Sequence, residues 1–274
     1  MNSTYQEIEG IKCYAPELAS VNDYFPEEYL RHLYKIEDEH FWYRSRNRVI
    51  KRLFKKYVGT SDPKNIMEIG CGNGFILKGL MEFKNYNLCG ADIHIQGLKH
   101  CKERLPDMDF IQLDATQMPF ENNFDAIGAF DVLEHIDDDI SVIKNIHKAL
   151  KPHGHFLISV PQYQWMWSHM DDIDQHKRRY ARKELNDKLT QNGFDVIYLS
   201  SFVFILFPLM AVSRLFKKNK NFQDRTFEEK LTELQLSPAM NFLLESFMRI
   251  DEMLLKIGLR LPFGGSLIAV ARKI

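Results

Sequence analysis

A short apolar run that ends in three glycines at alternate positions limits what this chain can fold into more than any other feature. Residues 65–74 read Asn-Ile-Met-Glu-Ile-Gly-Cys-Gly-Asn-Gly. Gly70, Gly72 and Gly74 carry no Cβ, so the main chain can bend sharply after a buried strand and a ligand can lie against bare backbone. Asp92 ends a second apolar run, where its carboxylate can accept hydrogen bonds from a ribose diol. The pattern therefore predicts a nucleoside site at the first strand-to-helix turn.

The glycine spacing does not fit a dinucleotide. The G-x-G-x-x-G pattern requires a glycine at position 75, where this chain has Phe75. Glu68, two residues before the first glycine, would repel a pyrophosphate, whereas a sulfonium ligand that carries an ammonium group tolerates a nearby acid. Both observations disfavour an NAD-dependent oxidoreductase, which stays open as the alternative by fold.

Composition excludes several classes of protein. Of the 274 residues, 45% are hydrophobic, which supports a large core, and the net charge of −1 gives no field that would attract nucleic acid. The four cysteines form no C-x-x-C pair, and the N-terminus has neither a basic stretch nor an apolar one. We therefore expect a cytoplasmic protein that binds no nucleic acid, and its oligomeric state stays open.

Strand and helix patterns alternate through the middle of the chain. The expected strands are 65–70, 86–93, 108–114, 124–130, 154–160, 195–202 and 266–271. The expected helices are 27–33, 37–57, 74–83, 95–104, 138–150, 182–192 and 239–258. Such alternation predicts an α/β fold with a doubly wound, seven-stranded, mostly parallel sheet that binds its ligand at the carboxyl ends of the strands. The domain organisation that follows is an N-terminal helical cap (1–60), a nucleoside-binding core (61–202), a helical insertion (203–262) and the last strand of the core sheet (263–274).

Residues 202–212 form an uninterrupted apolar run that is followed by Arg214 and the basic run 217–220. These 11 residues are too few to cross a bilayer, which takes about 20. We expect the sixth strand to continue here into a buried helix. The alternative is a peripheral membrane contact through residues 202–216, which would bring the site to a lipid.

Further stretches match one family in order and spacing. They are Asp92, the pair Asp114-Ala115 that closes the third strand, the run 123–136 (Asn-Phe-Asp-Ala-Ile-Gly-Ala-Phe-Asp-Val-Leu-Glu-His-Ile) and the run 150–157 (Leu-Lys-Pro-His-Gly-His-Phe-Leu). With the glycine turn, they resemble the class I S-adenosylmethionine-dependent methyltransferases over about residues 36–200. The resemblance implies the Rossmann-like methyltransferase fold, with an antiparallel last strand, and an enzyme that converts S-adenosylmethionine to S-adenosylhomocysteine.

The chain departs from the family pattern at two places. His153 replaces the first glycine of the L-K-P-G-G turn, and about sixty residues precede the last strand where the family usually has a short hairpin. The H-x-R-R-Y ending at 176–180 and the run His-Phe-Trp-Tyr-Arg-Ser-Arg-Asn from His40 resemble a bacterial and archaeal subgroup. Its members resemble enzymes that act on small molecules, quinone precursors or sugar-lipid intermediates.

The resemblance assigns the donor site. The expected cofactor-binding residues are Glu68, Gly70, Gly72, Gly74, Asp92, Ile93, Asp114, Ala115, Phe130, Asp131, Val132, Arg46 and Trp42. Asp92 would bind the ribose and Asp114 the adenine amino group. Trp42 and Arg46 would form a lid, with Arg46 reaching the donor carboxylate, although a helix packed for stability explains them nearly as well.

The loop after the fifth strand should face the methyl acceptor. The expected acceptor-binding residues are Trp165, Trp167, Arg178, Arg179, Tyr180 and His135. A hydroxyl nucleophile usually needs a general base with a pKa near neutrality, which favours His176 or else His169. The alternatives are that the arginines pair with nearby acids such as Asp171, that the tryptophans cover the core, and that His176 only holds the loop.

Asp131-x-x-Glu134-His135 resembles the E-x-x-E-H motif with which some small-RNA and quinone methyltransferases bind a divalent ion. Because the first position is Asp, one methylene shorter, we expect no metal. The leading prediction is methyl transfer to O, N or C of a small-molecule or lipid-linked acceptor. A non-catalytic S-adenosylmethionine-binding module stays open beside the oxidoreductase.

Overall fold

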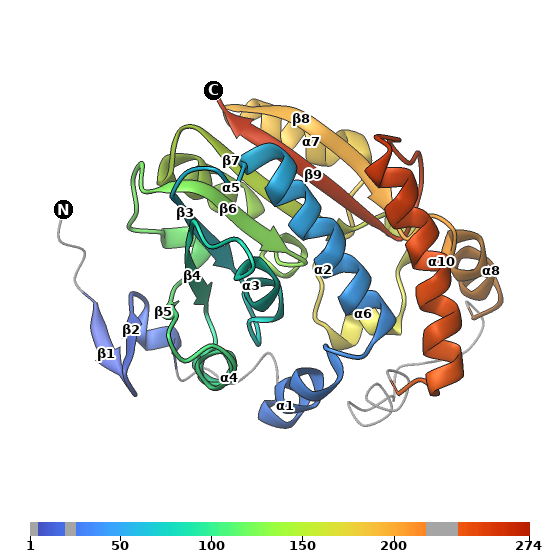
Figure 1. Ribbon diagram of the computed structural model, residues 1–274, viewed down its shortest axis with the longest axis horizontal. Helices are drawn as coiled ribbons and strands as arrows, with labels where there is room; N and C mark the ends of the chain where they lie inside the picture. Colours follow the sequence, from blue (N-terminus) through green and yellow to red (C-terminus); the bar gives the residue numbers. More distant parts are fainter. Residues whose placement is uncertain (1–4, 20–25, 218–234) are drawn as a thin grey trace.

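A mixed nine-stranded sheet organises the structure, a computed structural model that describes residues 5–19, 26–217 and 235–274 (Figure 1). Its strands, in spatial order, are β1 (Gln6–Ile8), β2 (Ile11–Cys13), β5 (Asp109–Gln112), β4 (Tyr86–Asp92), β3 (Lys64–Ile69), β6 (Phe124–Phe130), β7 (Leu150–Pro161), β9 (Ser266–Lys273) and β8 (Phe194–Phe202). The helices are α1 (Glu27–Ile36), α2 (Phe41–Leu53), α3 (Phe75–Leu80), α4 (Ile95–Arg104), α5 (Asp139–Ala149), α6 (His169–Ile173), α7 (Arg182–Gln191), α8 (Phe207–Lys217) and α10 (Pro238–Lys256).

The predicted fold class is confirmed. The strands from β2 to β7 pair in parallel, and β9 runs antiparallel between β7 and β8. The sheet has two strands more than the predicted seven, because the antiparallel hairpin β1–β2 joins its edge, where Lys12 lies opposite Ile111 of β5. Each strand of the hairpin has only 3 residues, too few for an alternating pattern to show in the sequence.

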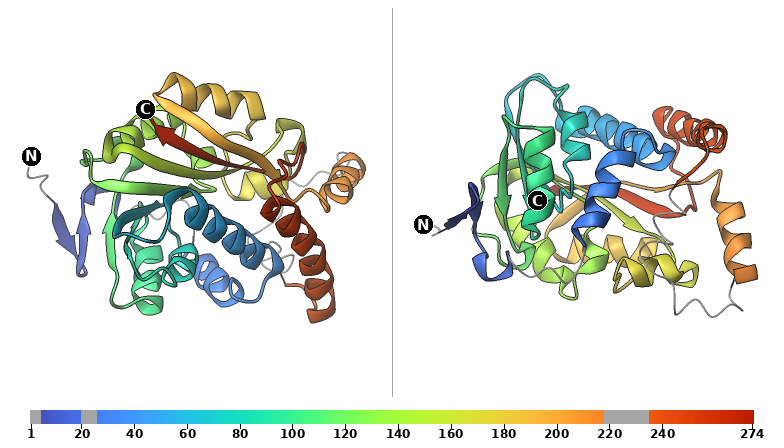
Figure 2. Two further views of the ribbon diagram at one scale, coloured as in Figure 1. Left: turned by 45° about the horizontal axis from the view of Figure 1, so that its top comes forward. Right: turned by 90° about the horizontal axis from the view of Figure 1, so that it is seen from below.

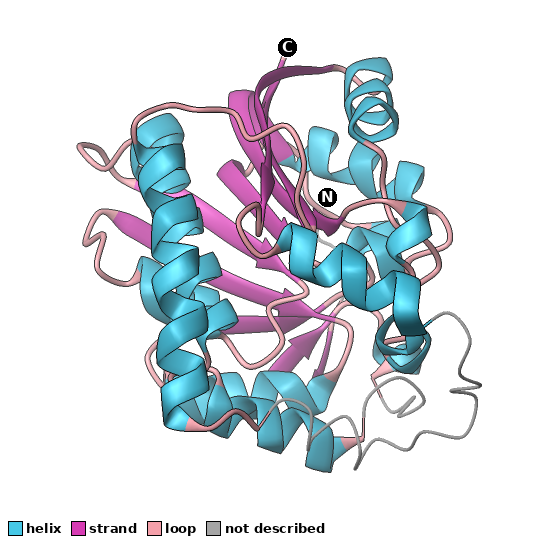
Figure 3. Ribbon diagram, turned by 90° about the vertical axis from the view of Figure 1, so that its right-hand side faces the viewer, coloured by secondary structure: helices cyan, strands magenta, loops and turns pink. Residues whose placement is uncertain are grey.

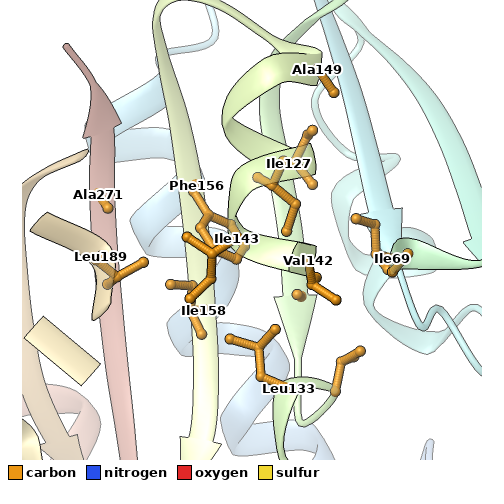
Figure 4. Packing of buried hydrophobic residues seen from close by; sticks show 14 of the residues in the cluster. Ile69, Ile127, Leu133, Val142, Ile143, Ala149, Phe156, Ile158, Leu189 and Ala271 are labelled. Carbon is orange, nitrogen blue, oxygen red and sulfur yellow. The ribbon is translucent and has the colours of Figure 1, made fainter. Parts of the chain in front are cut away.

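Helices cover both faces of the sheet (Figure 2). Side chains of β7 alternate between the faces, as strand geometry requires. Phe156 and Ile158 meet Val142 and Ile143 of α5 on one face (Figure 4), whereas Leu157 belongs to the cluster under α2, α3 and α10 on the other. The parallel strands are therefore buried on both sides, and their carboxyl ends are left to carry the site.

The insertion between β8 and β9 holds α8 and α10, on the right-hand side of Figure 1 and facing the viewer in Figure 3. It leaves and re-enters the sheet at neighbouring points, because Phe202 pairs with Ser266. The expectation of a buried helix after the sixth strand is wrong: Leu209 and Val212 of α8 are 65% and 48% exposed. Residues 218–220 of the basic run lie outside the described residues.

Buried acids fix α10 in place. Glu245 and Glu252 of α10 face the arginines of α2, and Oε1 of Glu252 accepts hydrogen bonds from Ser45 Oγ and Arg48 Nη2, both at 2.7 Å. The carboxylate of Asp251 accepts from two backbone N–H groups between β8 and α8. These contacts hold the insertion beside the carboxyl ends of the strands.

We predict that Glu252→Ala lowers the free energy of unfolding by about 3 kcal/mol, because it removes the buried acceptor of Ser45 and one of the two carboxylates that pair with Arg48. Urea unfolding followed by circular dichroism measures the loss. The matched control is Glu27→Ala, which removes an exposed ion pair with Arg31 and should cost less than about 0.5 kcal/mol. Equal losses in the two variants would contradict a structural role for the buried acid.

Candidate active site

A cavity of about 880 Å³ opens at the carboxyl ends of the central strands. Its walls come from α1, α2, the ends of β3, β4 and β6, the loop after β7, and the insertion. The predicted site residues that line it are Trp42, Arg46, Glu68, Gly70, Gly72, Asp92, Ile93, Asp114, Ala115, Phe130, Asp131, Val132, His135, His176 and Arg179. Those that lie outside its lining are Gly74, Trp165, Trp167, His169, Arg178 and Tyr180.

The three glycines of the first turn have different roles, although all have positive φ. A Cβ on Gly72 (φ +53°) would meet no atom within 4 Å, so this residue leaves open space on the cavity side. A Cβ on Gly70 would lie 2.4 Å from Cγ2 of Val132. Gly74 begins α3, and its Cβ would lie 3.2 Å from Sγ of Cys101. Only Gly72 therefore leaves room for a ligand, whereas Gly70 and Gly74 allow close packing.

Two carboxylates shape the backbone at neighbouring strand ends. Asp92 accepts from the N–H of Gly72 at 2.9 Å and from the N–H of His94 at 2.9 Å, so it ties the turn after β3 to the turn after β4. Asp114 accepts from the N–H and the hydroxyl of Thr116, both at 2.8 Å. Both acids line the cavity, beside the bare backbone of Gly72.

The lining of the cavity is strongly acidic, with eight carboxyl side chains and two arginines. Glu68 and Glu134 are 3% and 0% exposed, and Oε2 of Glu68 and both carboxyl oxygens of Glu134 have no hydrogen-bond partner among the described residues. Burial raises the pKa of both carboxyls. Because a buried acceptor without a donor is costly, the site fits a cationic ligand with N–H groups better than a pyrophosphate.

Arg46 is already partly engaged. Its Nη1 forms an ion pair with Oδ2 of Asp131, and its guanidinium lies over the Trp42 ring, 4.6 Å from the centroid. Asp131 adopts a left-handed conformation (φ +58°) and also accepts from Ser159 Oγ at 3.0 Å. Nε of Arg46 is buried without a hydrogen-bond partner among the described residues, so one donor of this arginine stays unsatisfied.

His176 belongs to a chain of polar contacts. Its Nδ1 lies 2.9 Å from Oδ1 of Asp171, a buried carboxylate that also accepts from Nε and Nη2 of Arg179 at 2.7 and 2.9 Å. Burial alone would raise the pKa of Asp171, but the hydrogen bonds from His176 and Arg179 outweigh it and hold the pKa below its usual range. An ionised Asp171 favours a proton on Nδ1 of His176, which leaves Nε2 as the acceptor. Arg179 therefore pairs with an acid, as one of the two sequence-based alternatives has it.

His135 packs edge-on against His176, with ring centroids 4.7 Å apart. Burial, together with the neighbouring His176, lowers the pKa of His135 to about 4, so this ring is neutral near pH 7. Glu134, His135 and His176 each offer a ligand atom within 4.8 Å of the others, so they are the described residues that are placed to hold a metal ion. The expectation of no metal stays a prediction.

Two residues of the H-x-R-R-Y ending point away from the cavity. Tyr180 is fully buried, and its hydroxyl donates to Oδ2 of Asp139 at 2.6 Å. Arg178 lies 3.2 Å from the same carboxylate. These contacts tie the loop to the start of α5, so the ending stabilises the loop that carries His176.

The other outlying residues belong to the outer side of the same loop. Trp165 is 54% exposed and stacks on Tyr163, with ring centroids 5.8 Å apart. Trp167 donates from Nε1 to Asp172 at 2.9 Å. His169 is the first residue of α6 and does not line the cavity, so the structure separates the two candidate bases.

One wall of the cavity is apolar and was missed by sequence reasoning. Leu206, Leu209 and Met210 reach it from the segment after β8, and Leu244 reaches it from α10. The signal was present as long apolar runs, but such runs do not show which side chains face a cavity. Asp171 was considered only as a partner of the arginines, because its contact with His176 depends on the shape of the loop.

Comparisons with known proteins agree with this geometry. A family model described as a methyltransferase domain matches residues 38–199, more than half of the chain. The cycloartenol-C-24-methyltransferase of Arabidopsis thaliana is 27% identical over 191 residues, which cover 59% of this chain and 56% of that protein. The ubiquinone biosynthesis O-methyltransferase of Pseudomonas aeruginosa is 34% identical over 102 residues, which cover 35% of this chain and 44% of that protein. The chain thus spans about half the length of these curated relatives.

A solved structure shows the same fold. Phosphoethanolamine N-methyltransferase 2 of Haemonchus contortus, in complex with S-adenosyl-L-methionine, superposes with a TM-score of 0.59 at 18% identity, over 92% of this chain and 58% of that one. The sheet order, the glycine turn after β3 and the family match therefore all indicate a methyltransferase domain. We set the oxidoreductase alternative aside. This chain belongs to the family of class I S-adenosylmethionine-dependent methyltransferases.

Proposed function

We propose that this enzyme methylates a hydroxyl oxygen of an apolar, lipid-like small molecule. The observation that carries the proposal is that a single cavity is lined both by His176, whose Nδ1 contacts Asp171 behind it, and by the apolar wall of Leu206, Met210 and Leu244. The pair suits an acceptor that must lose a proton, and the wall suits an acceptor that leaves water for an apolar surface.

The proposed donor position follows from the part of the cavity that is lined by carboxyl groups and by the exposed backbone of Gly72. The ribose hydroxyls would lie at Asp92, the adenine between Ile93 and Val132 near Asp114, and the amino group near Glu68. Bound there, the donor supplies a methyl group on a positively charged sulfur, which becomes a neutral thioether on transfer. The excess of carboxyl groups favours the charged donor over its neutral product.

His176 is the proposed general base. Nε2 would take the hydroxyl proton while the acceptor oxygen forms its bond to the methyl carbon, and Asp171 would stabilise the imidazolium that results. The bidentate bond from Arg179 keeps Asp171 ionised and in position. The proton then passes to solvent, so the histidine returns to its starting state.

Two relatives support an apolar acceptor by their names, which are cycloartenol-C-24-methyltransferase and ubiquinone biosynthesis O-methyltransferase. The same proposal includes three inferences from the sequence: membership of the H-x-R-R-Y subgroup, a cytoplasmic location and a lack of nucleic-acid partners. It also includes the division into cap (1–60), core (61–202), insertion (203–262) and last strand (263–274).

The first test of the proposed function concerns donor binding. Gly72→Val should weaken binding of S-adenosylhomocysteine at least about tenfold in calorimetry, because the new side chain would occupy the ligand's space. Gly59→Val is the matched control, since Gly59 also has positive φ (+79°) and an open Cβ position but does not line the cavity. Valine is strained at both positive-φ positions, and Gly59 (φ +79°, ψ 163°) lies in a region that only glycine adopts readily. A loss of donor binding that is confined to Gly72→Val therefore cannot be caused by backbone strain alone. Equal affinity in both would contradict this donor site.

The second prediction concerns the base. His176→Gln should lower turnover by about 10²–10⁴-fold while S-adenosylhomocysteine still binds, and His169→Gln should leave turnover unchanged. Single-turnover assays and calorimetry on the same preparations separate chemistry from binding. Activity that is lost in EDTA and restored by a divalent cation would show that His176 acts as a metal ligand and would overturn its role as the base.

The third prediction concerns the acceptor. Incubation of the enzyme with a deuterated-methyl donor and fractionated cell lipids should give a labelled product in the apolar fraction, with a mass gain that matches one methyl per hydroxyl. Mass spectrometry detects the label. Label that appears only among water-soluble metabolites would refute the apolar acceptor but leave the methyltransferase assignment in place.

A further inference from the structure

The outer side of the insertion exposes an apolar ridge, which we define as Leu209 of α8 with Phe242, Leu243, Met253 and Ile257 on and just after α10. These side chains are 65%, 74%, 48%, 56% and 68% exposed. Both helices lie on the side of the molecule that faces the viewer in Figure 3. A group of exposed apolar side chains of this size marks an interaction surface.

The charges around the ridge are positive. The three acids of α10 (Glu245, Asp251 and Glu252) are buried. The exposed charged side chains of α10 are Lys256 and Arg249, of which Arg249 lies 3.5 Å from the carboxylates of Glu245 and Glu252. The sequence of α8 contains no acid. A helix whose outer face combines large apolar side chains with basic ones is typical of binding to the surface of an anionic bilayer.

One residue of the ridge, on its α8 part, also borders the cavity. Leu209 is exposed on the ridge and also lines the cavity, next to Leu206, Met210 and Leu244. A membrane that covers the ridge would therefore adjoin the apolar wall of the site. An apolar acceptor could move from the bilayer to the enzyme without crossing water.

We propose that the apolar ridge docks on an anionic lipid surface and that the cavity takes its acceptor from that surface. Within the described residues, no helix has both the length and the apolar character needed to cross a membrane. The helices would lie in the plane of the interface. A symmetric contact with a second copy is the other occupant that the test distinguishes. The route of the acceptor rests on the proposed function, whereas the docking does not.

Flotation of the full chain with vesicles tests the docking without donor or acceptor. We expect the protein to float with phosphatidylcholine vesicles that contain phosphatidylglycerol, and less with phosphatidylcholine alone. Phe242→Ser/Ile257→Ser should lower the partition coefficient about tenfold or more, and Lys256→Glu should lower it about fivefold or more at low salt. All three positions are exposed, so folding should be retained, which circular dichroism checks.

Met81→Ser is the matched control, because Met81 is 43% exposed and lies outside the ridge. It should float like the unaltered protein. The proposal is overturned if the unaltered chain does not float, if the ridge variants float equally well, or if they only abolish a dimer seen by light scattering. A failure to find an apolar acceptor would refute the proposed function but would not affect the flotation result.

Discussion

The carboxylate of Asp92 is the interaction on which the proposed donor end of the cavity depends. It accepts from the backbone of Gly72 and of His94, and so it joins the ends of two parallel strands through one side chain. Since parallel strands present their carboxyl ends at one edge, the side chains that follow β3, β4 and β6 converge there. The bare backbone at Gly72 then faces the cavity with its open side. The N–H of Cys71, which donates to the carbonyl of Ala91 at 3.1 Å, adds a backbone bond between the same two strand ends.

The proposed donor half of the site was predictable because its determinants are local. A glycine turn or an acid at a strand end has its position fixed once the strand is recognised, and a parallel sheet brings the strand ends together. Glu68 and Asp114 were located in this way, and both line the cavity. What the pattern did not show is that Gly74 packs against Cys101 instead of facing a ligand. A spacing rule cannot tell a glycine needed for a ligand from one needed for packing.

The proposed acceptor half was much less predictable. The pair His176–Asp171 spans a loop in which Gln175 has positive φ (+54°), so its geometry depends on backbone conformations that no periodicity reveals. Tyr180 was expected at the acceptor but lies in the core. Likewise, an apolar run such as 202–212 does not show whether its helix meets the core, the cavity or the solvent. These choices are made by tertiary packing, and the exposed face of α8 is one result.

The pairing of Phe202 with Ser266 has a consequence for how such enzymes can diversify. The sixty or so residues between them depart from one point of the sheet and come back to the next, so their exchange would not alter strand order or the turn at Gly72. This segment can therefore be replaced during evolution without a change in the rest of the sheet. A new segment would give the cavity a different wall for another substrate, while the nucleoside-binding end stays the same.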